Sequence, residues 1–167
     1  MRRINFIVAL FVLWAVPMTV FAGSASPADN AAAPAKWILV RPSQEKWQKG
    51  PTSLWPGAQM AILEGDPNQL GFFTMRLKMP DGYKVYPHWH PMTERLTVIS
   101  GTVNLGVGDK FDPKATTPLT AGTYSSMAPK MAHYAWIKGE SILQLSSIGP
   151  WKVVYVNPGD DPRNHTK

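Results

Sequence analysis

Turn-forming residues constrain this chain more than any other feature of its sequence. It carries 16 prolines and 13 glycines among 167 residues, and they recur along its whole length. Proline removes a backbone donor and disrupts a helix interior, so this spacing leaves little room for a helical bundle. Hydrophobic residues still make up 44% of the chain, which is too many for a disordered protein. The sequence therefore predicts one globular, all-β domain.

Short segments of alternating polarity support this fold class. Residues 72–79 alternate most clearly, with Phe73, Met75, Leu77 and Met79 on one face and Thr74, Arg76 and Lys78 on the other. Further strands are expected at 37–40, 59–64, 94–100, 102–107, 120–127, 133–137, 141–147 and 151–156, and no helix longer than ten residues is expected after the N-terminal segment. Many short strands separated by turns are typical of a sandwich or a barrel.

The N-terminal segment has the pattern of a secretory signal peptide. Arg2 and Arg3 precede an apolar run at 6–20, and Val20-Phe21-Ala22 fits a cleavage site. A membrane anchor is the alternative, but the run is shorter than the roughly 20 residues that span a bilayer. We expect a signal peptide at 1–22, with cleavage after Ala25 as a second possibility, and a periplasmic or secreted protein.

The rest of the chain divides into three parts. A flexible, small-residue leader is expected at 23–36, the folded domain at 37–160 and a polar tail at 161–167. Loss of the two signal arginines lowers the net charge from +6 to +4. The mature chain has no run of three basic residues, so we expect no nucleic-acid partner and no membrane contact after cleavage. The lack of cysteine excludes disulfides, thiolate metal sites and a lipid anchor on cysteine.

Two of the four histidines are close together in the sequence. His88, His90 and Glu94 have the same parity, so a strand interrupted by a tight turn at Pro91 would aim all three inward, and Leu96 and Val98 continue this face toward the core. Buried imidazoles and a buried carboxylate are costly unless a group binds them, and a divalent metal ion suits both donor types. The alternatives are an exposed His-x-His pair or a single hydrogen-bonded core histidine.

The spacing around these residues resembles the first motif of the cupin superfamily. It consists of Gly82, five residues, His88-x-His90, three residues, Glu94, six residues and Gly101. The second cupin motif has a glycine eleven residues before a histidine, and Gly122 and His133 are similar to it. This second motif departs from the family pattern, with Ala128 in place of proline, Lys130 in place of glycine and Ile137 in place of asparagine. These departures put the shape of the turn before His133 in doubt.

The resemblance implies a double-stranded β-helix, the cupin jelly-roll barrel, over the domain at 37–160. By analogy, the metal ligands are His88, His90, Glu94 and His133, and the ion is iron, manganese, zinc, nickel or copper. Four protein ligands leave positions open on a five- or six-coordinate ion, which suits a small anionic ligand. Similarity to small cupins also makes a homodimer plausible.

The resemblance leaves two main functions open. One is an exported metalloenzyme similar to the cupin dioxygenases or the isomerases and lyases; the other is a non-catalytic module that binds or senses a small ligand or a metal, and a metal that only stabilises the fold is a weaker third reading. No catalytic residue is assigned, and Glu64 and Lys78 are the nearest acid–base candidates. No organic cofactor is expected.

Several other residues carry weaker interpretations. Gln144 and Ser146 either line the cavity or face solvent, and His165 in the tail is expected to be exposed. Methionines flank the ligand segments at Met92, Met127 and Met131, where cavity filling is favoured over copper binding. Tyr86, Trp89 and Trp136 have the opposite parity to the ligands and are expected to pack against a loop, a sheet or a partner subunit.

Overall fold

The computed structural model describes residues 37–165. The predicted signal peptide and leader at 1–36, and the last two residues of the tail, lie outside the described residues. The strands are β1 (Gln48–Lys49), β2 (Gln59–Glu64), β3 (Gly71–Met79), β4 (Lys84–Trp89), β5 (Glu94–Val107), β6 (Thr117–Thr120), β7 (Tyr124–Met127), β8 (His133–Gly149) and β9 (Val154–Tyr155). Within 37–165 the only helices are three-residue 3-10 turns, η1 (Pro42–Gln44), η2 (Pro158–Asp160) and η3 (Pro162–Asn164). The all-β prediction is confirmed, and no helix in this part of the chain is long and apolar enough to cross a membrane.

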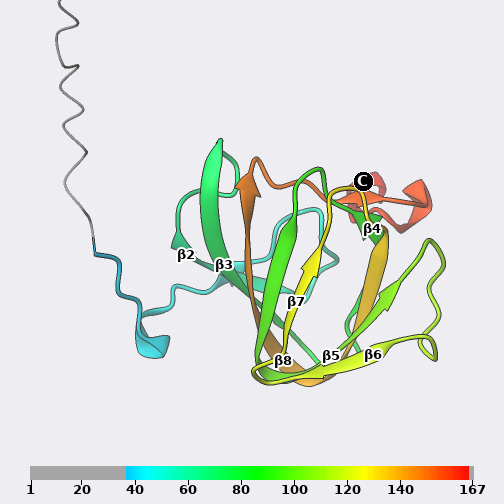
Figure 1. Cartoon of the computed structure of the whole chain (residues 1–167), viewed down its shortest axis with the longest axis horizontal. Coiled ribbons are helices and arrows are strands. Elements are labelled where there is room, and N and C mark those ends of the chain that lie inside the picture. Colours follow the sequence, from blue (N-terminus) through cyan, green and yellow to red (C-terminus); the bar gives the residue numbers. More distant parts are fainter. Residues whose placement is uncertain (1–36, 166–167) are drawn as a thin grey trace, which may run out of the picture. The chain divides into compact units, whose positions relative to one another are not determined.

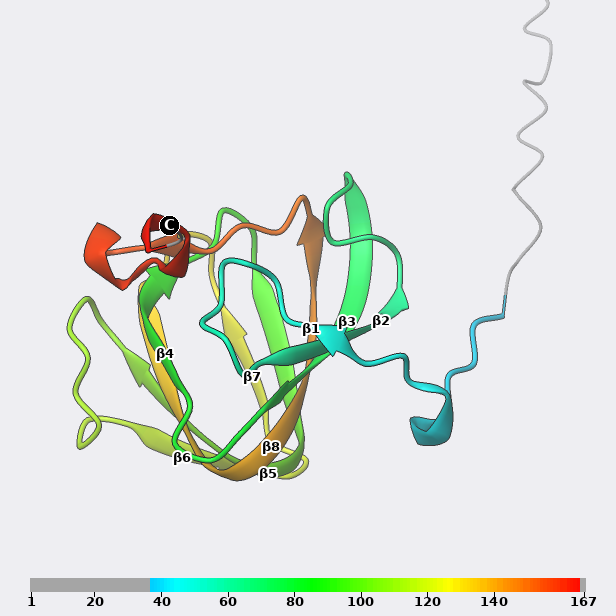
Figure 2. The same cartoon turned by 180° about the vertical axis from the view of Figure 1, so that it is seen from behind.

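The two longest strands, β5 and β8, organise the fold. They pair antiparallel along their lengths, and both bend in the middle, near the bottom of Figure 1. The first half of β5 and the second half of β8 belong to a layer with β7 on one side and β3, β2 and β1 on the other. The second half of β5 pairs with β6. The first half of β8 pairs with β4, which in turn pairs with β9. The result is one antiparallel sheet folded into two facing layers, which Figure 2 shows from behind.

The bend in β5 depends on Gly101. The register of β5 against β8 shifts between Val98 and Ser100 and again between Ser100 and Thr102. Gly101 has φ +78°, and a Cβ atom there would lie 2.1 Å from Ser141 Oγ and 2.6 Å from the backbone oxygen of Glu140. Only glycine combines this backbone conformation with this close approach.

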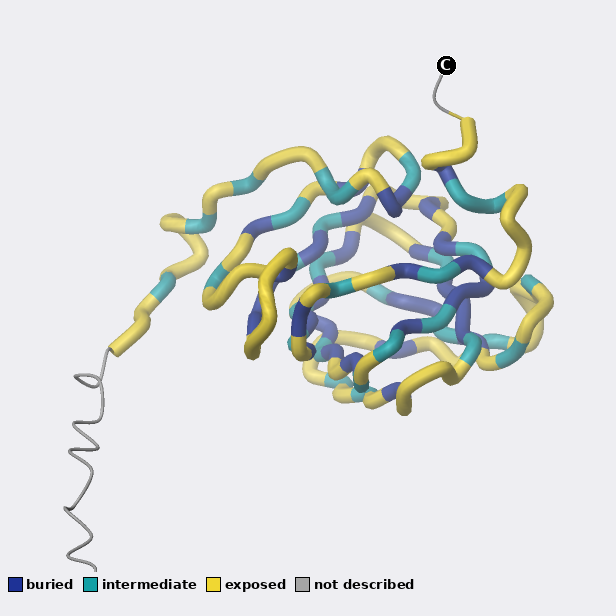
Figure 3. The backbone as a smooth tube through the Cα atoms, turned by 90° about the horizontal axis from the view of Figure 1, so that it is seen from above, coloured by how far each residue is buried: buried dark blue, intermediate teal, exposed yellow. Residues whose placement is uncertain are grey.

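The core fills the space between the two layers. Phe73, Met75, Leu77 and Met79 are buried there, which confirms the predicted inner face of this strand. In Figure 3 the buried stretches lie along the strands, and the turns and C-terminal segment are mostly exposed. On the outer face, Ser146 Oγ lies 3.0 Å from Thr74 Oγ1, and Arg76 Nε donates to Gln144 Oε1 at 3.2 Å. Gln144 and Ser146 therefore lie outside the cavity.

Some predicted strand boundaries are wrong. Residues 37–40 form no strand and are largely exposed, and the expected strand at 120–127 is interrupted at 121–123, where Gly122 turns the chain with φ +86°. The expected strand at 151–156 is reduced to β9. The sequence also predicts separate strands before and after Gly101, and again before and after Gly139. In the structure each of these two pairs is one continuous strand, because strand pairing resumes past the glycine and the strand bends instead of ending.

Candidate metal centre

Four side chains singled out by the sequence meet inside the barrel. His88 is the last residue but one of β4, and His90 follows that strand. Glu94 begins β5, and His133 begins β8, where it pairs across the sheet with His88. All four are at least 95% buried. The centroid of the His88 ring lies 4.3 Å from that of His133 and 4.9 Å from that of His90. The chain bends at 91–92, between the end of β4 and the start of β5, and this bend brings His88, His90 and Glu94 to one interior point.

Backbone carbonyl groups fix the orientation of each imidazole. The Nδ1 atom of His88 lies 2.7 Å from Tyr86 O, that of His133 lies 2.9 Å from Met131 O, and that of His90 lies 2.8 Å from Lys152 O. A carbonyl oxygen only accepts, so each Nδ1 donates its hydrogen and Nε2 of a neutral ring keeps its lone pair. One ring nitrogen of each histidine lies within 4.8 Å of those of the others.

Glu94 places its carboxylate between two of these rings. Its Oε1 lies 3.2 Å from His90 Nε2, and its Oε2 lies 3.3 Å from His133 Nε2. Burial alone would raise the pKa of Glu94, but the adjoining His90 and His133 outweigh it and hold that pKa far below its usual range. Glu94 is therefore an anion at neutral pH.

The two histidines in the first motif differ in their affinity for protons. Burial, together with repulsion from His133 and His90, lowers the pKa of His88 to about 3, so its ring is neutral. Burial would also lower the pKa of His90, but the adjacent negative charge of Glu94 outweighs burial and raises it. Without another cation, the cluster therefore favours positive charge on the ring closest to Glu94 Oε1.

The donor set fits a divalent metal ion. His90 Nε2 is buried and makes no hydrogen bond with acceptable geometry, which is costly for a polar atom inside a protein. A cation among the histidine nitrogens would pair with this atom and with the charge on Glu94. Neutral imidazole nitrogens and a carboxylate oxygen are ligands that zinc, iron, nickel, copper and manganese accept. The three histidines could therefore hold a metal ion.

The turn before His133 forms despite its departures from the cupin pattern. Lys130 takes the position of the family's glycine with φ +63°, a conformation that glycine adopts more easily. Its backbone N–H donates to His90 O at 2.9 Å, and the N–H of Met131 donates to Ala128 O at 3.1 Å. The turn thus joins the second motif to the first through the hydrogen bond between Lys130 and His90, and it places His133 in the cluster.

A small, mostly apolar cavity adjoins the cluster. It measures about 50 Å³, room for a few water molecules. Its lining consists of Leu54, Leu77, Met79, Val85, His88, Glu94, Leu96, Val103, Leu105, His133, Ala135, Leu143, Leu145 and Trp151. The ionisable side chains in this lining all belong to the cluster. Glu64 is exposed at the end of β2, and Lys78 Nζ lies 4.3 Å from the ring centroid of Trp47, so neither acid–base candidate is brought to the site.

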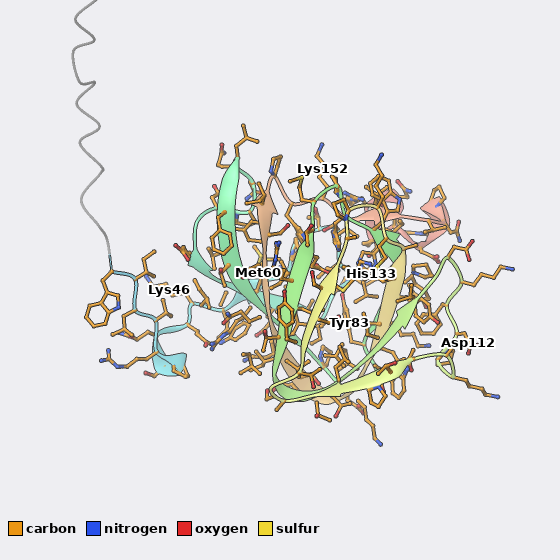
Figure 4. The ribbon with its side chains drawn as sticks, in the orientation of Figure 1. Lys46, Met60, Tyr83, Asp112, His133 and Lys152 are labelled. Atoms are coloured by element: carbon orange, nitrogen blue, oxygen red, sulfur yellow. The ribbon has the colours of Figure 1, made fainter. Side chains whose placement is uncertain are left out.

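Three residues of the site have no signal in the sequence motifs. Trp151 stacks on His90, with ring centroids 5.3 Å apart and an interplanar angle of 19°, and the carbonyl of Lys152 holds the same ring. Leu54 comes from the long loop between β1 and β2. Figure 4 labels His133 and Lys152, which reach the site from β8 and from the segment that follows it. Only the path of the chain in three dimensions brings these segments to the histidines.

The remaining sequence candidates lie elsewhere. Met127 fills the core, whereas Met92 and Met131 are partly exposed, and none of the three lines the cavity. Tyr86 packs on Phe111 in the β5–β6 loop at 5.5 Å between ring centroids, which confirms the expected loop contact. The exposed His165 lies against Trp55, at 5.3 Å between ring centroids.

Comparisons with known structures identify the fold. The chain is similar to a polyketide cyclase from Streptomyces resistomycificus (15% identity, TM-score 0.63, covering 78% of this chain and 92% of that one). It is also similar to a putative acetylacetone dioxygenase from Methylibium petroleiphilum (19%, 0.59, 78% and 88%) and to an RmlC-like cupin from Shewanella frigidimarina (18%, 0.53, 69% and 94%). These likenesses confirm the predicted cupin jelly roll.

The sequence itself places the chain in a family. A comparison with curated protein sequences finds no match. The model of a family described as a domain of unknown function, DUF4437, matches residues 30–154. The chain therefore belongs to the DUF4437 family, a cupin-like family.

Proposed function

We propose that this protein is an exported metalloenzyme of the cupin type, in which His88, His90, Glu94 and His133 hold a divalent metal ion that engages a small anionic substrate. The observation that supports it best is the convergence of three buried imidazoles, each with Nδ1 bound to a carbonyl, around one buried carboxylate. The Nε2 atom of His90 lies 3.2 Å from Glu94 Oε1 but makes no hydrogen bond of acceptable geometry, and such an ion would satisfy it.

The bound ion would supply Lewis-acid or redox chemistry, depending on which metal it is. The chain's own groups set the conditions for it. The backbone carbonyl groups of Tyr86, Met131 and Lys152 accept hydrogen bonds from the rings and so orient them. Without these hydrogen bonds the imidazole rings would be free to rotate. The single charge of Glu94 leaves a site with a 2+ ion near +1, which favours an anionic ligand. Most of the cavity wall is apolar.

The cavity narrows the reaction class. Its lining offers no ionisable side chain beyond the cluster, so it has no separate general base to remove a proton from carbon. This composition favours a substrate that arrives already as a carboxylate or an enolate. Chemistry like that of the dioxygenases named among the similar folds fits this requirement better than isomerase or lyase chemistry does. A non-catalytic module that binds a small anion needs no base either, and it is the second candidate for the same reason.

Elemental analysis tests the metal proposal. Protein purified without affinity metals should contain close to one equivalent of iron, manganese, zinc, nickel or copper. The His88→Ala/His133→Ala variant should lose it, and the matched control His165→Ala, at a histidine outside the cluster, should keep it. Equal metal content in all three proteins, or no uptake of added metal by any of them, would refute the proposed centre.

A second measurement separates the enzyme from the binding module. Iron-loaded protein is mixed with a panel of short carboxylates, β-diketones and phenols, and oxygen consumption and ligand binding are followed together. Consumption with one compound, lost in the double variant, supports a dioxygenase. Tight binding of one compound without turnover supports the binding module.

Export and assembly are separate proposals. The basic residues at Arg2 and Arg3 and the apolar run at 6–20 support cleavage after Ala22 and a periplasmic or secreted location. N-terminal sequencing of the protein from cell fractions tests this. The homodimer expected from the cupin resemblance stays a prediction, which light scattering of the purified protein checks.

A further inference from the structure

Trp151 is held firmly at the edge of the candidate metal centre. Its backbone N–H donates to Pro67 O at 2.7 Å, and the preceding Gly149 packs so closely on the same loop that an added Cβ would lie 2.2 Å from Gln69 O. On the other side its ring stacks on His90. These contacts fix the indole in one position beside the cluster.

The indole nitrogen of Trp151 makes no hydrogen bond within the described residues. Its Nε1 atom is buried, and no acceptor in this part of the chain has hydrogen-bonding geometry with it. Buried tryptophan N–H groups normally find an acceptor, and one that does not calls for an explanation. Trp136 shows the ordinary case in this molecule, because its Nε1 donates to Thr116 Oγ1 at 3.3 Å. Trp151 also lines the cavity together with His88, Glu94 and His133. Because Trp151 lines the cavity, a group that enters the cavity can supply the acceptor that its N–H lacks.

We propose that the indole N–H of Trp151 donates a hydrogen bond to an oxygen atom of the ligand at the metal centre, and that this ligand is a compact monoanion with an apolar remainder. The inference rests on the proposed metal function and names its substrate class. A donor beside a cation selects an atom that carries negative charge and accepts a hydrogen bond, which describes a carboxylate or enolate oxygen.

The rest of the cavity accounts for the single charge and the small size. Leucine, valine, alanine and methionine make up most of the wall, and the lining contains no lysine or arginine. A second carboxylate or a phosphate would lie there without a counter-charge, which is costly. The volume of about 50 Å³ admits a few non-hydrogen atoms.

Ligand binding to the zinc-loaded protein tests this inference, with acetate as the probe. The variant Trp151→Phe keeps an aromatic ring to stack on His90 and removes the N–H. We expect it to keep its zinc and to bind acetate about 10- to 100-fold more weakly, the usual effect of losing a hydrogen bond to a charged group. The matched control Trp136→Phe removes an indole N–H outside the cavity and should bind acetate as the wild type does.

A spectroscopic readout does not depend on the variant's affinity. The indole N–H resonance of Trp151 in the zinc-loaded wild type is identified by its absence from the spectrum of Trp151→Phe, and it should shift downfield when acetate is added.

A comparison of two four-carbon acids tests the ligand class: butyrate, with one carboxylate, should bind at least tenfold more tightly than succinate, with two. If the zinc-loaded variant binds acetate as the wild type does, or if the resonance does not move, the role of Trp151 is refuted and the metal centre stands. Tighter binding of succinate refutes the ligand class. Wild-type protein that takes up no zinc or other metal refutes both proposals.

Discussion

The metal-free protein should lose stability as the pH falls below 6.5, because His88 resists protonation. This ring is 95% buried, and burial together with repulsion from His133 and His90 lowers its pKa to about 3, against 6.5 in the unfolded chain. Between these values the unfolded chain binds a proton that the folded chain does not. The free energy of unfolding therefore rises with pH across this range and falls as the solution is acidified.

The window from pH 6.5 to 4.5 isolates His88 from its neighbours. The pKa of His90 is raised, so its ring is protonated in both states below 6.5, and its stabilising effect is lost only as the pH rises through the raised value. The pKa of Glu94 is lowered from 4.5, so it is ionised in both states above 4.5, and its effect is lost only below that. The unfolded histidine is half protonated at pH 6.5 and almost fully protonated at pH 4.5, so this difference in bound protons changes the free energy of unfolding by about 2.3 kcal/mol over the window.

Urea denaturation of chelator-treated protein, followed by tryptophan fluorescence, measures this difference. The variant His88→Asn keeps an amide donor for the carbonyl of Tyr86 and removes the titrating ring, so its stability should be lower but nearly flat over the window. The control His165→Asn changes an exposed histidine and should keep the full slope. A loss below about 1 kcal/mol in the wild type, or the same slope in His88→Asn, would show that His88 is not buried as a neutral group.

Three further substitutions test the backbone and the core, each by denaturant unfolding at neutral pH. Lys130→Gly should stabilise the protein by about 0.5–1 kcal/mol, because glycine avoids the left-handed strain at φ +63° and loses part of that gain in backbone entropy; a destabilised variant would mean that the lysine side chain makes an essential contact. Gly101→Ala should cost at least about 2 kcal/mol, because the new Cβ would lie 2.6 Å from a backbone oxygen, and a neutral result would contradict the tight bend. Phe73→Ala should cost about 3–5 kcal/mol, since the side chain is fully buried, and a loss under 1 kcal/mol would contradict its place in the core.

Strand periodicity predicts the fold well only where the strands are straight. The alternation from Phe73 to Met79 gives the buried face correctly. His88, His90 and Glu94 are buried as predicted, but they meet across the break at 90–93 between β4 and β5 and not along one straight strand. Parity fails at bends. In β5 the side chains that join the hydrophobic core pass from even-numbered Leu96 and Val98 to odd-numbered Val103, because the register shifts on either side of Ser100. A sequence rule that reads each strand separately has no means of detecting such a shift.

Contacts within one short segment orient two of the three histidines, and a contact with a distant segment orients the third. His88 and His133 each donate Nδ1–H to the carbonyl two residues earlier, Tyr86 O and Met131 O. That arrangement follows from the backbone of one short segment. His90 differs, because its acceptor is Lys152 O, 62 residues away in the sequence. No spacing motif encodes this contact, which depends on where the chain runs after β8.

The segment after β8 therefore connects the two parts of the proposed function. Lys152 orients the His90 ring through its carbonyl, while the adjacent Trp151 stacks on that ring, lines the cavity and has an N–H without a hydrogen-bond partner in the described residues. A displacement of this segment would turn a candidate metal ligand and move a candidate substrate donor together. The metal affinity and the anion affinity of the protein should thus respond jointly to changes that move this backbone. They should respond separately to Trp151→Phe, which removes the N–H and part of the ring system but keeps an aromatic ring to stack on His90. This contrast distinguishes a donor at the ligand from a residue that merely supports His90.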